Sequence, residues 1–108
     1  MKNLMNLYDD AAWEDAEGYM SGTKRKVLRD ENGARTVLLK LPAGFYMAPH
    51  SHVVCEQHFV LEGEYSSDGK RISKGSYQIF SPHDEHGPFE SKDGAIILVV
   101  WDPITIVK

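Results

Sequence analysis

The sequence predicts an all-β protein, folded as a closed barrel or a sandwich of about eight or nine short strands. Short runs rich in Val, Ile, Leu, Thr and aromatic residues recur along the chain, and turn residues such as Gly, Pro, Asn and Asp separate them. No internal repeat is visible, and no apolar run reaches the roughly 18 residues of a membrane-spanning helix. These three observations indicate a small β domain.

The chain length predicts the domain organisation. At 108 residues the chain suits one domain that buries roughly 60% of the surface exposed by its unfolded form. We expect residues 1–108 to form this single domain, with residues 1–22 as an N-terminal arm and residues 23–108 as the β-barrel. The arm is acidic and mixed in character.

Aromatic and aliphatic residues are scattered through the arm. Leu4, Leu7 and Tyr8 have the spacing of one helical turn. Trp13 and Tyr19 are interpreted as anchors that tie the arm to the barrel or to a second subunit, in preference to a binding site.

Charge and cysteine content limit the partners and the compartment. The formal net charge of −4 and the lack of a Lys/Arg-rich face argue against nucleic acid or a membrane as partner. The one basic cluster, Lys24-Arg25-Lys26, is interpreted as a solvated strand edge in preference to a binding patch.

The single Cys55 excludes an intrachain disulfide and suits a reducing compartment, and the N-terminus lacks a signal-type apolar core, so we expect a cytoplasmic protein.

The first half of the predicted barrel begins with a hairpin. Residues 23–29 and 35–41 are rich in Val, Leu and Thr, and Asn32-Gly33 between them suits a tight turn with positive φ. Pro42-Ala43-Gly44 breaks the sheet before Phe45-Tyr46-Met47.

The second half contains further turns and strands. Asp68-Gly69 separates an outgoing segment from a returning one. Residues 76–80 alternate as a half-buried strand, and the apolar run 95–101 is predicted to be a strand with both faces buried. Residues 104–107 supply a last strand.

The chemistry of the sequence is concentrated between Gly44 and Gly63, where three histidines and a glutamate occur within nine residues. Imidazole nitrogen and carboxylate oxygen are ligands that suit first-row divalent metals. On a strand, His50 and His52 point to the same face about 6.6 Å apart, but a straight strand would place Glu56 roughly 13 Å further on. We therefore expect a reversal within residues 51–55, with Glu56 starting the next strand and facing the two histidines.

This stretch resembles the first signature of the cupin superfamily: Gly44, five residues, His50-x-His52, three residues, Glu56, six residues, Gly63. The second signature, a glycine, five residues, Pro-x-Gly, two residues and a histidine, matches Gly75 and His86 in spacing. Ser81 and His83 stand where its proline and glycine belong.

The resemblance implies a cupin-type double-stranded β-helix, a jelly-roll barrel. It also implies one divalent transition metal held by His50, His52, Glu56 and His86, and a homodimer. The ligand set suits Fe, Mn, Ni, Cu or Zn and does not select among them.

Three nearby residues have alternative interpretations. The resemblance gives His58 no metal role. It is interpreted as a cavity residue that binds ligand or orients Glu56, and as the candidate catalytic acid, base or hydrogen-bond donor. The alternatives are a satisfied core histidine or another metal ligand. His83 is expected at the barrel mouth, exposed to solvent, and Cys55 is interpreted as a small buried residue in preference to a redox group.

The runs Val60–Tyr65, Lys74–Tyr77 and His86–Gly94 are similar to the cupin domain of zinc-binding anti-sigma factors and to small dioxygenases that act on diketones. The helical zinc-binding part of anti-sigma factors has no counterpart here. The leading hypothesis is a metal-dependent, dioxygenase-like enzyme for a small oxygenated organic compound. The alternatives are a non-catalytic cupin with structural Zn(II) that senses a small molecule or metal, and an isomerase or decarboxylase of a sugar or keto acid.

Overall fold

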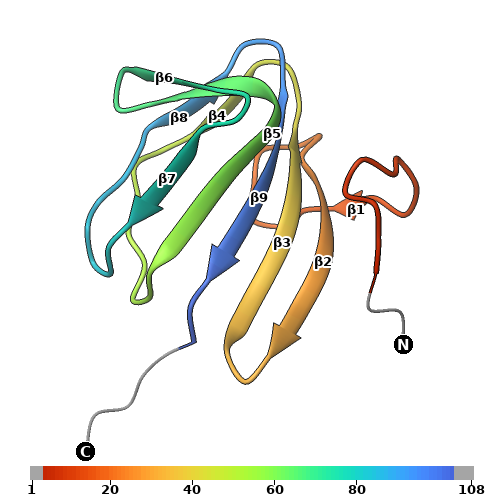
Figure 1. Cartoon of the computed structure of the whole chain (residues 1–108). Helices are drawn as coiled ribbons and strands as arrows, with labels where there is room; N and C mark the ends of the chain where they lie inside the picture. The colour runs from red at the N-terminus through yellow and green to blue at the C-terminus, as the bar shows by residue number, and fades with distance from the viewer. Residues whose placement is uncertain (1–3, 104–108) are drawn as a thin grey trace, which may run out of the picture.

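The chain folds into two antiparallel sheets that share one long, bent strand (Figure 1). The computed structural model describes residues 4–103. Within this part there is no helix, and the strands are β1 (Glu14–Asp15), β2 (Lys24–Glu31), β3 (Ala34–Leu41), β4 (Phe45–Met47), β5 (Glu56–Ser67), β6 (Lys70–Ser73), β7 (Tyr77–Phe80), β8 (Phe89–Ser91) and β9 (Ala95–Trp101). The predicted all-β fold with an N-terminal arm is confirmed.

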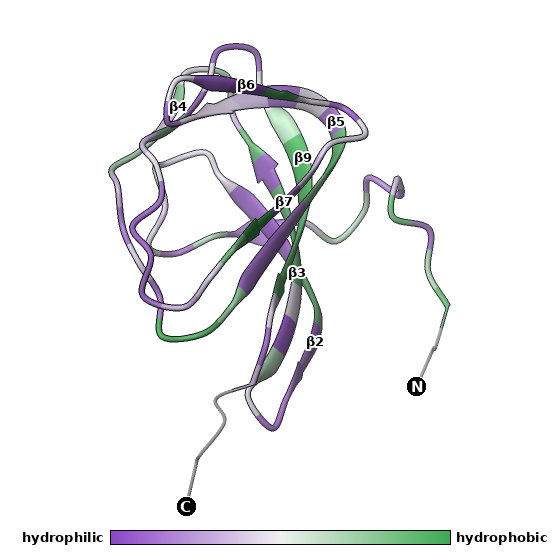
Figure 2. Cartoon of the chain, turned by 60° about the vertical axis from the view of Figure 1, so that its left-hand side comes forward, coloured by the Kyte–Doolittle hydropathy of each residue, from purple (hydrophilic) through white to green (hydrophobic). Residues whose placement is uncertain are grey.

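Strand β5 joins the two sheets. Its first part pairs with β7 on one side and β9 on the other, and β3, β2 and β1 extend this larger sheet. Its last residues pair with β6 and β8, and β4 lies beyond β8. Figure 2 shows the two sheets curling around a common interior.

The change of sheet follows a glycine. The register of β5 against β9 shifts between Val60 and Glu62, and Gly63 then has φ +68°. A Cβ at Gly63 would lie 2.3 Å from the carbonyl oxygen of Gly94, so the backbones meet too closely for any side chain. This contact accounts for the glycine that ends the first signature.

The core lies on the inner face of the larger sheet. Val37, Leu39 and Leu41 alternate along β3 and face Ile97 and Val99 of the neighbouring strand, and all five are buried. Strand β9 alternates between buried and half-buried residues, so the prediction that both of its faces are buried is wrong for the outer face. Each buried aliphatic side chain of this kind contributes about 1.5–3 kcal/mol relative to exposure.

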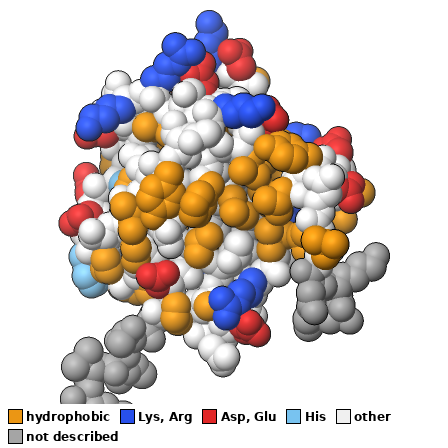
Figure 3. All heavy atoms as spheres, in the orientation of Figure 1, with side chains coloured by type: hydrophobic (Ala, Val, Ile, Leu, Met, Phe, Trp, Pro, Cys, Tyr) orange, Lys and Arg blue, Asp and Glu red, His pale blue; other side chains and the backbone are white. Residues whose placement is uncertain are grey.

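The outer face of the larger sheet is unusually apolar. Figure 3 shows hydrophobic side chains gathered in a band across this side of the molecule. Tyr77 and Ile79 of β7 are 51% and 57% exposed, and the Tyr77 ring lies 4.9 Å from that of Phe59.

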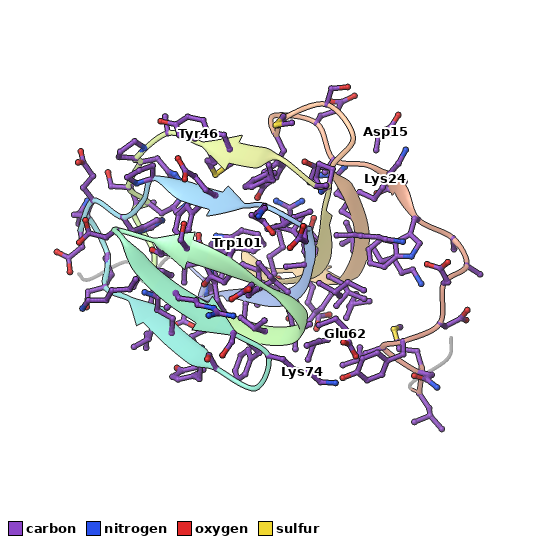
Figure 4. The ribbon with its side chains drawn as sticks, turned by 90° about the horizontal axis from the view of Figure 1, so that it is seen from above. Asp15, Lys24, Tyr46, Glu62, Lys74 and Trp101 are labelled. Atoms are coloured by element: carbon purple, nitrogen blue, oxygen red, sulfur yellow. The ribbon has the colours of Figure 1, made fainter. Side chains whose placement is uncertain are left out.

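The N-terminal arm crosses the edge of the larger sheet. Strand β1 pairs with β2, so the basic cluster is covered by a strand and is not a free edge. Lys24 pairs with Asp15 at the periphery of the molecule (Figure 4). Trp13 lies beside Lys26, whose Nζ is 4.7 Å from the ring centroid, whereas Tyr19 packs against the core, as expected of anchors.

The structure tests the turn and helix that the sequence predicted. Asn32 and Gly33 have φ values of 52° and 82°, and the predicted hairpin is confirmed. The predicted helical turn at Leu4, Leu7 and Tyr8 is wrong: Asp9 N–H bonds the Asn6 carbonyl in an isolated turn. The strand predicted at residues 104–107 lies outside the described residues. Residues 4–103 form no helix able to cross a membrane.

Candidate metal centre

Two loops meet at the rim of the barrel and carry the histidines. His50 and His86 form an antiparallel bridge with N–O distances of 2.9 and 2.8 Å, and His83 N–H bonds the His52 carbonyl at 2.6 Å. Strand β5 then begins at Glu56, so the predicted reversal within residues 51–55 is confirmed. This backbone pairing brings residues that are 36 positions apart to one place.

Four side chains converge there: those of His50, His52, Glu56 and His86. One donor atom from each lies within 4.8 Å of all the others. The Nε2 atoms of His50 and His86 are 3.1 Å apart, and His52 Nε2 lies 2.9 Å from Glu56 Oε1. Donors around an ion with bonds of about 2.1 Å are separated by roughly 3–4 Å, so the cluster has the dimensions of a coordination shell.

The hydrogen bond of His50 also leaves one of its ring nitrogens free to bind a metal. His50 Nδ1 lies 3.1 Å from the Ala48 carbonyl, and an N–H there leaves Nε2 with a free lone pair. That lone pair faces His86 Nε2 at 3.1 Å, so His50 can accept a hydrogen bond from His86 without a metal and can bind a cation in place of that proton. His86 Nδ1 is buried and has no hydrogen-bond partner among residues 4–103. The donor set therefore fits a divalent transition metal, although binding itself stays a prediction.

Glu56 is the most heavily bonded residue of the cluster. It is 3% exposed, and its Oε1 accepts a hydrogen bond of 2.6 Å from Trp101 Nε1 while its Oε2 lies 2.5 Å from His58 Nε2. Burial raises the pKa of Glu56, but the hydrogen bond from His58 and the charges of His58, His52 and His86 outweigh burial and lower it. Glu56 is thus held as a carboxylate in a fixed orientation.

His58 extends this network away from the cluster. Its Nδ1 lies 2.9 Å from the Tyr65 hydroxyl, which donates to Gln78 Oε1 at 3.0 Å. Because that hydroxyl donates to Gln78, it accepts from His58, so His58 Nδ1 carries a proton. Burial, followed by the charge of Glu56, raises the pKa of Tyr65, which therefore stays a neutral phenol.

An aromatic and apolar shell surrounds the histidines. The ring of His86 lies 4.3 Å from that of Phe80 and 5.6 Å from that of Phe89. Burial lowers the pKa of His86 to about 4, and the neighbouring histidines act in the same direction while Glu56 opposes them. His86 is therefore neutral at pH 7, the form that binds a metal.

A cavity of about 250 Å³ opens beside the cluster. Its walls are mainly apolar and include Leu39, Leu41, Phe45, Met47, Phe89, Ile97 and Val99. Three of the predicted metal ligands, His50, His52 and Glu56, line it together with His58, and residues 17–19 of the arm complete the wall. The arrangement can hold a small organic molecule with its polar end at the cluster.

The remaining predicted residues lie outside this cavity. His83 is exposed, as predicted, with φ +67° in the loop before His86. Cys55 is half-buried, and burial raises the pKa of its thiol, which disfavours a reactive thiolate.

Sequence reasoning missed Trp101 and Tyr65 as partners of the site and Tyr19 as part of the cavity wall. In the sequence, the only indication that Trp101 faces inward is that residues 97, 99 and 101 would share one face of a strand.

A four-donor cluster beside an apolar cavity, inside a β-barrel whose long strand starts at the glutamate, defines the cupin class. Residues 2–105 match the family of ChrR cupin-like domains, and the chain belongs to this family.

Solved structures agree with this assignment. One is a complex of SigE with the anti-sigma factor ChrR from Rhodobacter sphaeroides: the matched chain is 26% identical with a TM-score of 0.73, over 88% of this chain and 51% of that one. A putative acetylacetone dioxygenase from Methylibium petroleiphilum PM1 is 23% identical with a TM-score of 0.77, over 100% of this chain and 83% of that one. An acetylacetone dioxygenase from Acinetobacter johnsonii is 18% identical with a TM-score of 0.76, over 94% of this chain and 74% of that one.

A curated relative shares only part of its length with this chain. Methylthioalkylmalate synthase 3 of Arabidopsis thaliana, a chloroplastic enzyme, is 29% identical over 82 residues. That match covers 76% of this chain and 16% of the plant enzyme. The chain thus spans a small part of that protein and about half of the matched chain in the SigE–ChrR complex.

Proposed function

We propose that this chain is a metal-dependent cupin enzyme of dioxygenase type that acts on a small oxygenated organic compound. The observation that carries the proposal is the convergence of three imidazoles and one carboxylate beside a mainly apolar cavity of about 250 Å³. The likeness in fold to acetylacetone dioxygenases supports the choice of a ketone or enol as ligand.

His50, His52, Glu56 and His86 would hold the metal. A bound Fe, Mn, Ni, Cu or Zn ion supplies Lewis acidity, and a redox-active one also supplies oxygen activation. The apolar walls exclude water and orient the body of the ligand, so that its oxygen atoms face the cluster.

His58 acts through Glu56. Both of its nitrogens are engaged, Nε2 with Glu56 and Nδ1 with Tyr65, so it holds a proton against the carboxylate and fixes the carboxylate's orientation. The hydroxyl of Tyr65 and the side chain of Gln78 keep the His58 ring in place.

Metal analysis and oxygen uptake test the proposal together. The protein is purified without chelators, its metal is measured, and each of Fe(II), Mn(II), Ni(II), Cu(II) and Zn(II) is loaded in turn. Oxygen uptake is then followed with pentane-2,4-dione and larger diketones. We expect uptake with at least one redox-active metal and none with zinc. No uptake with any metal, from protein that holds zinc tightly, would refute the enzyme proposal.

A non-catalytic, zinc-holding sensor is the second candidate. Four protein donors can fill the tetrahedral shell of a structural zinc site, and this leaves fewer positions for substrate and oxygen. The match to the ChrR cupin-like family supports this candidate as well. A ligand that raises the Tm of the zinc protein but is not transformed would favour it.

We also propose that the chain forms a homodimer. The exposed Tyr77 and Ile79 on the outer face of the larger sheet support this assembly, since isolated monomers rarely expose large contiguous apolar areas. Sedimentation of the wild type and of Ile79→Lys tests it: a monomeric wild type would end the proposal.

A further inference from the structure

Trp101 stands beside Glu56 because two strands pair there. It is the last residue of β9, and its Cα lies opposite that of Glu56, the first residue of β5. A hydrogen bond of 3.1 Å from Asp102 N–H to the Cys55 carbonyl continues this pairing beyond the ends of the two strands. The backbone therefore fixes the position from which the Trp101 side chain approaches the carboxylate.

The indole ring of Trp101 is also held in its orientation. Trp101 shares one face of β9 with Ile97 and Val99, and its side chain packs against the core. From the neighbouring strand β3, the guanidinium carbon of Arg35 lies 5.3 Å from the ring centroid, within the range of a cation–π contact. A ring that is packed on the core and contacted by Arg35 has little freedom to turn.

This placement directs the indole N–H at one oxygen of Glu56. Trp101 Nε1 donates to Glu56 Oε1 at 2.6 Å, and the same oxygen lies 2.9 Å from Nε2 of His52, a proposed metal ligand. The second oxygen, Oε2, lies 2.5 Å from His58 Nε2. Each oxygen thus has its own partner, and a rotation of the carboxylate would break both hydrogen bonds.

The orientation of Glu56 matters because it is the one anionic residue of the four-residue cluster. A free glutamate side chain samples several rotamers, and binding an ion costs the entropy of fixing one of them. Trp101 and His58 fix the rotamer when the chain folds, before a metal arrives. The indole N–H suits this task because it only donates a hydrogen bond and offers no lone pair to the ion.

We propose that Trp101 is a positioning residue of the metal centre, whose indole N–H holds the Glu56 carboxylate in place for metal binding. This inference rests on the metal-dependent function proposed above and adds to it a residue outside both cupin signatures. Residues that hydrogen-bond a metal ligand typically contribute about tenfold to a hundredfold in metal affinity.

Two substitutions separate the N–H of Trp101 from its bulk. Trp101→Phe removes the donor and keeps an aromatic ring against the core. Trp101→His loses the benzene half of the indole but can place its Nε2 where the indole Nε1 stands, because one ring atom separates each nitrogen from Cγ. The Kd for zinc, measured by competition with a chelating dye, should rise at least about tenfold in Trp101→Phe and stay within about threefold of the wild type in Trp101→His.

A side chain that only filled space would give the reverse order of zinc affinities, because His leaves the larger cavity. Trp13→Phe is the matched control. The indole N–H of Trp13 also bonds a carboxylate, that of Asp10 at 3.0 Å, but this pair lies on the exposed arm. Its loss should leave the Kd for zinc within about twofold of the wild type.

A measurement on the wild type tests the inference if neither Trp101 variant folds. The chain has two tryptophans, so ¹⁵N labelling of the indoles gives two N–H signals, and Trp13→Phe leaves only that of Trp101. One equivalent of zinc should shift the Trp101 signal, because the ion draws charge from the oxygen that accepts its hydrogen bond, and should leave the Trp13 signal in place. A Trp101 signal that zinc does not move would overturn the inference.

The outcomes separate the role of Trp101 from the function on which it rests. Equal Kd values for zinc in the wild type and Trp101→Phe, or a larger loss in Trp101→His than in Trp101→Phe, would overturn that role while the metal centre stands. A wild type that holds no metal in any of the five loadings would overturn the proposed function and the inference built on it.

Discussion

Tyr65→Phe tests the hydrogen-bond network behind Glu56 by removing a single oxygen. The Tyr65 side chain is 2% exposed, and its hydroxyl accepts from His58 Nδ1 and donates to Gln78 Oε1. Phe keeps the ring and its packing against Phe89, so the change removes two hydrogen bonds and little else.

The expected loss of stability follows from the partners that remain. A buried polar group left without its partner costs about 1–3 kcal/mol. His58 is buried and its Nδ1 would lose the hydrogen bond to the Tyr65 hydroxyl, whereas Gln78 is half-buried and water replaces part of its loss. We expect the free energy of unfolding to fall by about 2–4 kcal/mol, and Tm by roughly 10 °C or more.

Tyr77→Phe is the matched control. Its hydroxyl also bonds a glutamine, Gln57 Oε1, at 2.6 Å, but this tyrosine is 51% exposed. With Ile79→Lys in the background of both variants to keep the chain monomeric, we expect a loss below about 1 kcal/mol, because water then satisfies both groups. Urea denaturation of the metal-free proteins measures both variants. Equal losses, or a loss below about 1 kcal/mol for Tyr65→Phe, would mean that the buried network does not hold His58.

Three further predictions concern metal, pH and backbone. His86→Ala should lose bound zinc in equilibrium dialysis, whereas His58→Ala and the exposed His83→Ala keep one ion per chain; zinc loss from His58→Ala would show that it is a ligand. Because burial lowers the pKa of His86 from 6.5 to about 4, the unfolded chain binds more protons between these pH values. The metal-free protein should therefore lose stability as pH falls from 7 to 4.5, and urea midpoints that do not change with pH would contradict this. Gly63→Ala should destabilise by several kcal/mol more than Gly69→Ala, since both have positive φ but only Gly63 faces a carbonyl at 2.3 Å; thermal melts of equal Tm would refute that reasoning.

Local signals in the sequence predicted local structure correctly. Asn32-Gly33 gave the hairpin because its turn needs two residues with positive φ. The reversal before Glu56 followed from strand geometry, since a straight strand would have carried the carboxylate away from His50 and His52. The position of His86 opposite His50 came from the spacing of the second cupin signature, despite Ser81 and His83 in place of its proline and glycine.

The pairing of strands that are far apart in the chain could not be predicted from local sequence signals. Trp101 reaches Glu56 because β9 pairs with β5, an alignment of residues 45 positions apart that no local pattern encodes. The two-residue strand β1 is too short to produce a periodic signal, and its pairing with β2 carries the arm to the inner face, where Tyr19 joins the cavity. The helical spacing of Leu4, Leu7 and Tyr8 was misleading, since Leu4 and Tyr8 are exposed and bury no apolar face that could stabilise an isolated helical turn.

Anomalous diffraction from crystals loaded with one equivalent of Zn(II) tests the central claim most directly. We predict a single peak about 2.0–2.2 Å from one nitrogen of each of His50, His52 and His86 and from a carboxylate oxygen of Glu56. A peak at the exposed His83 or at Cys55, with none inside the four-residue cluster, would contradict the account.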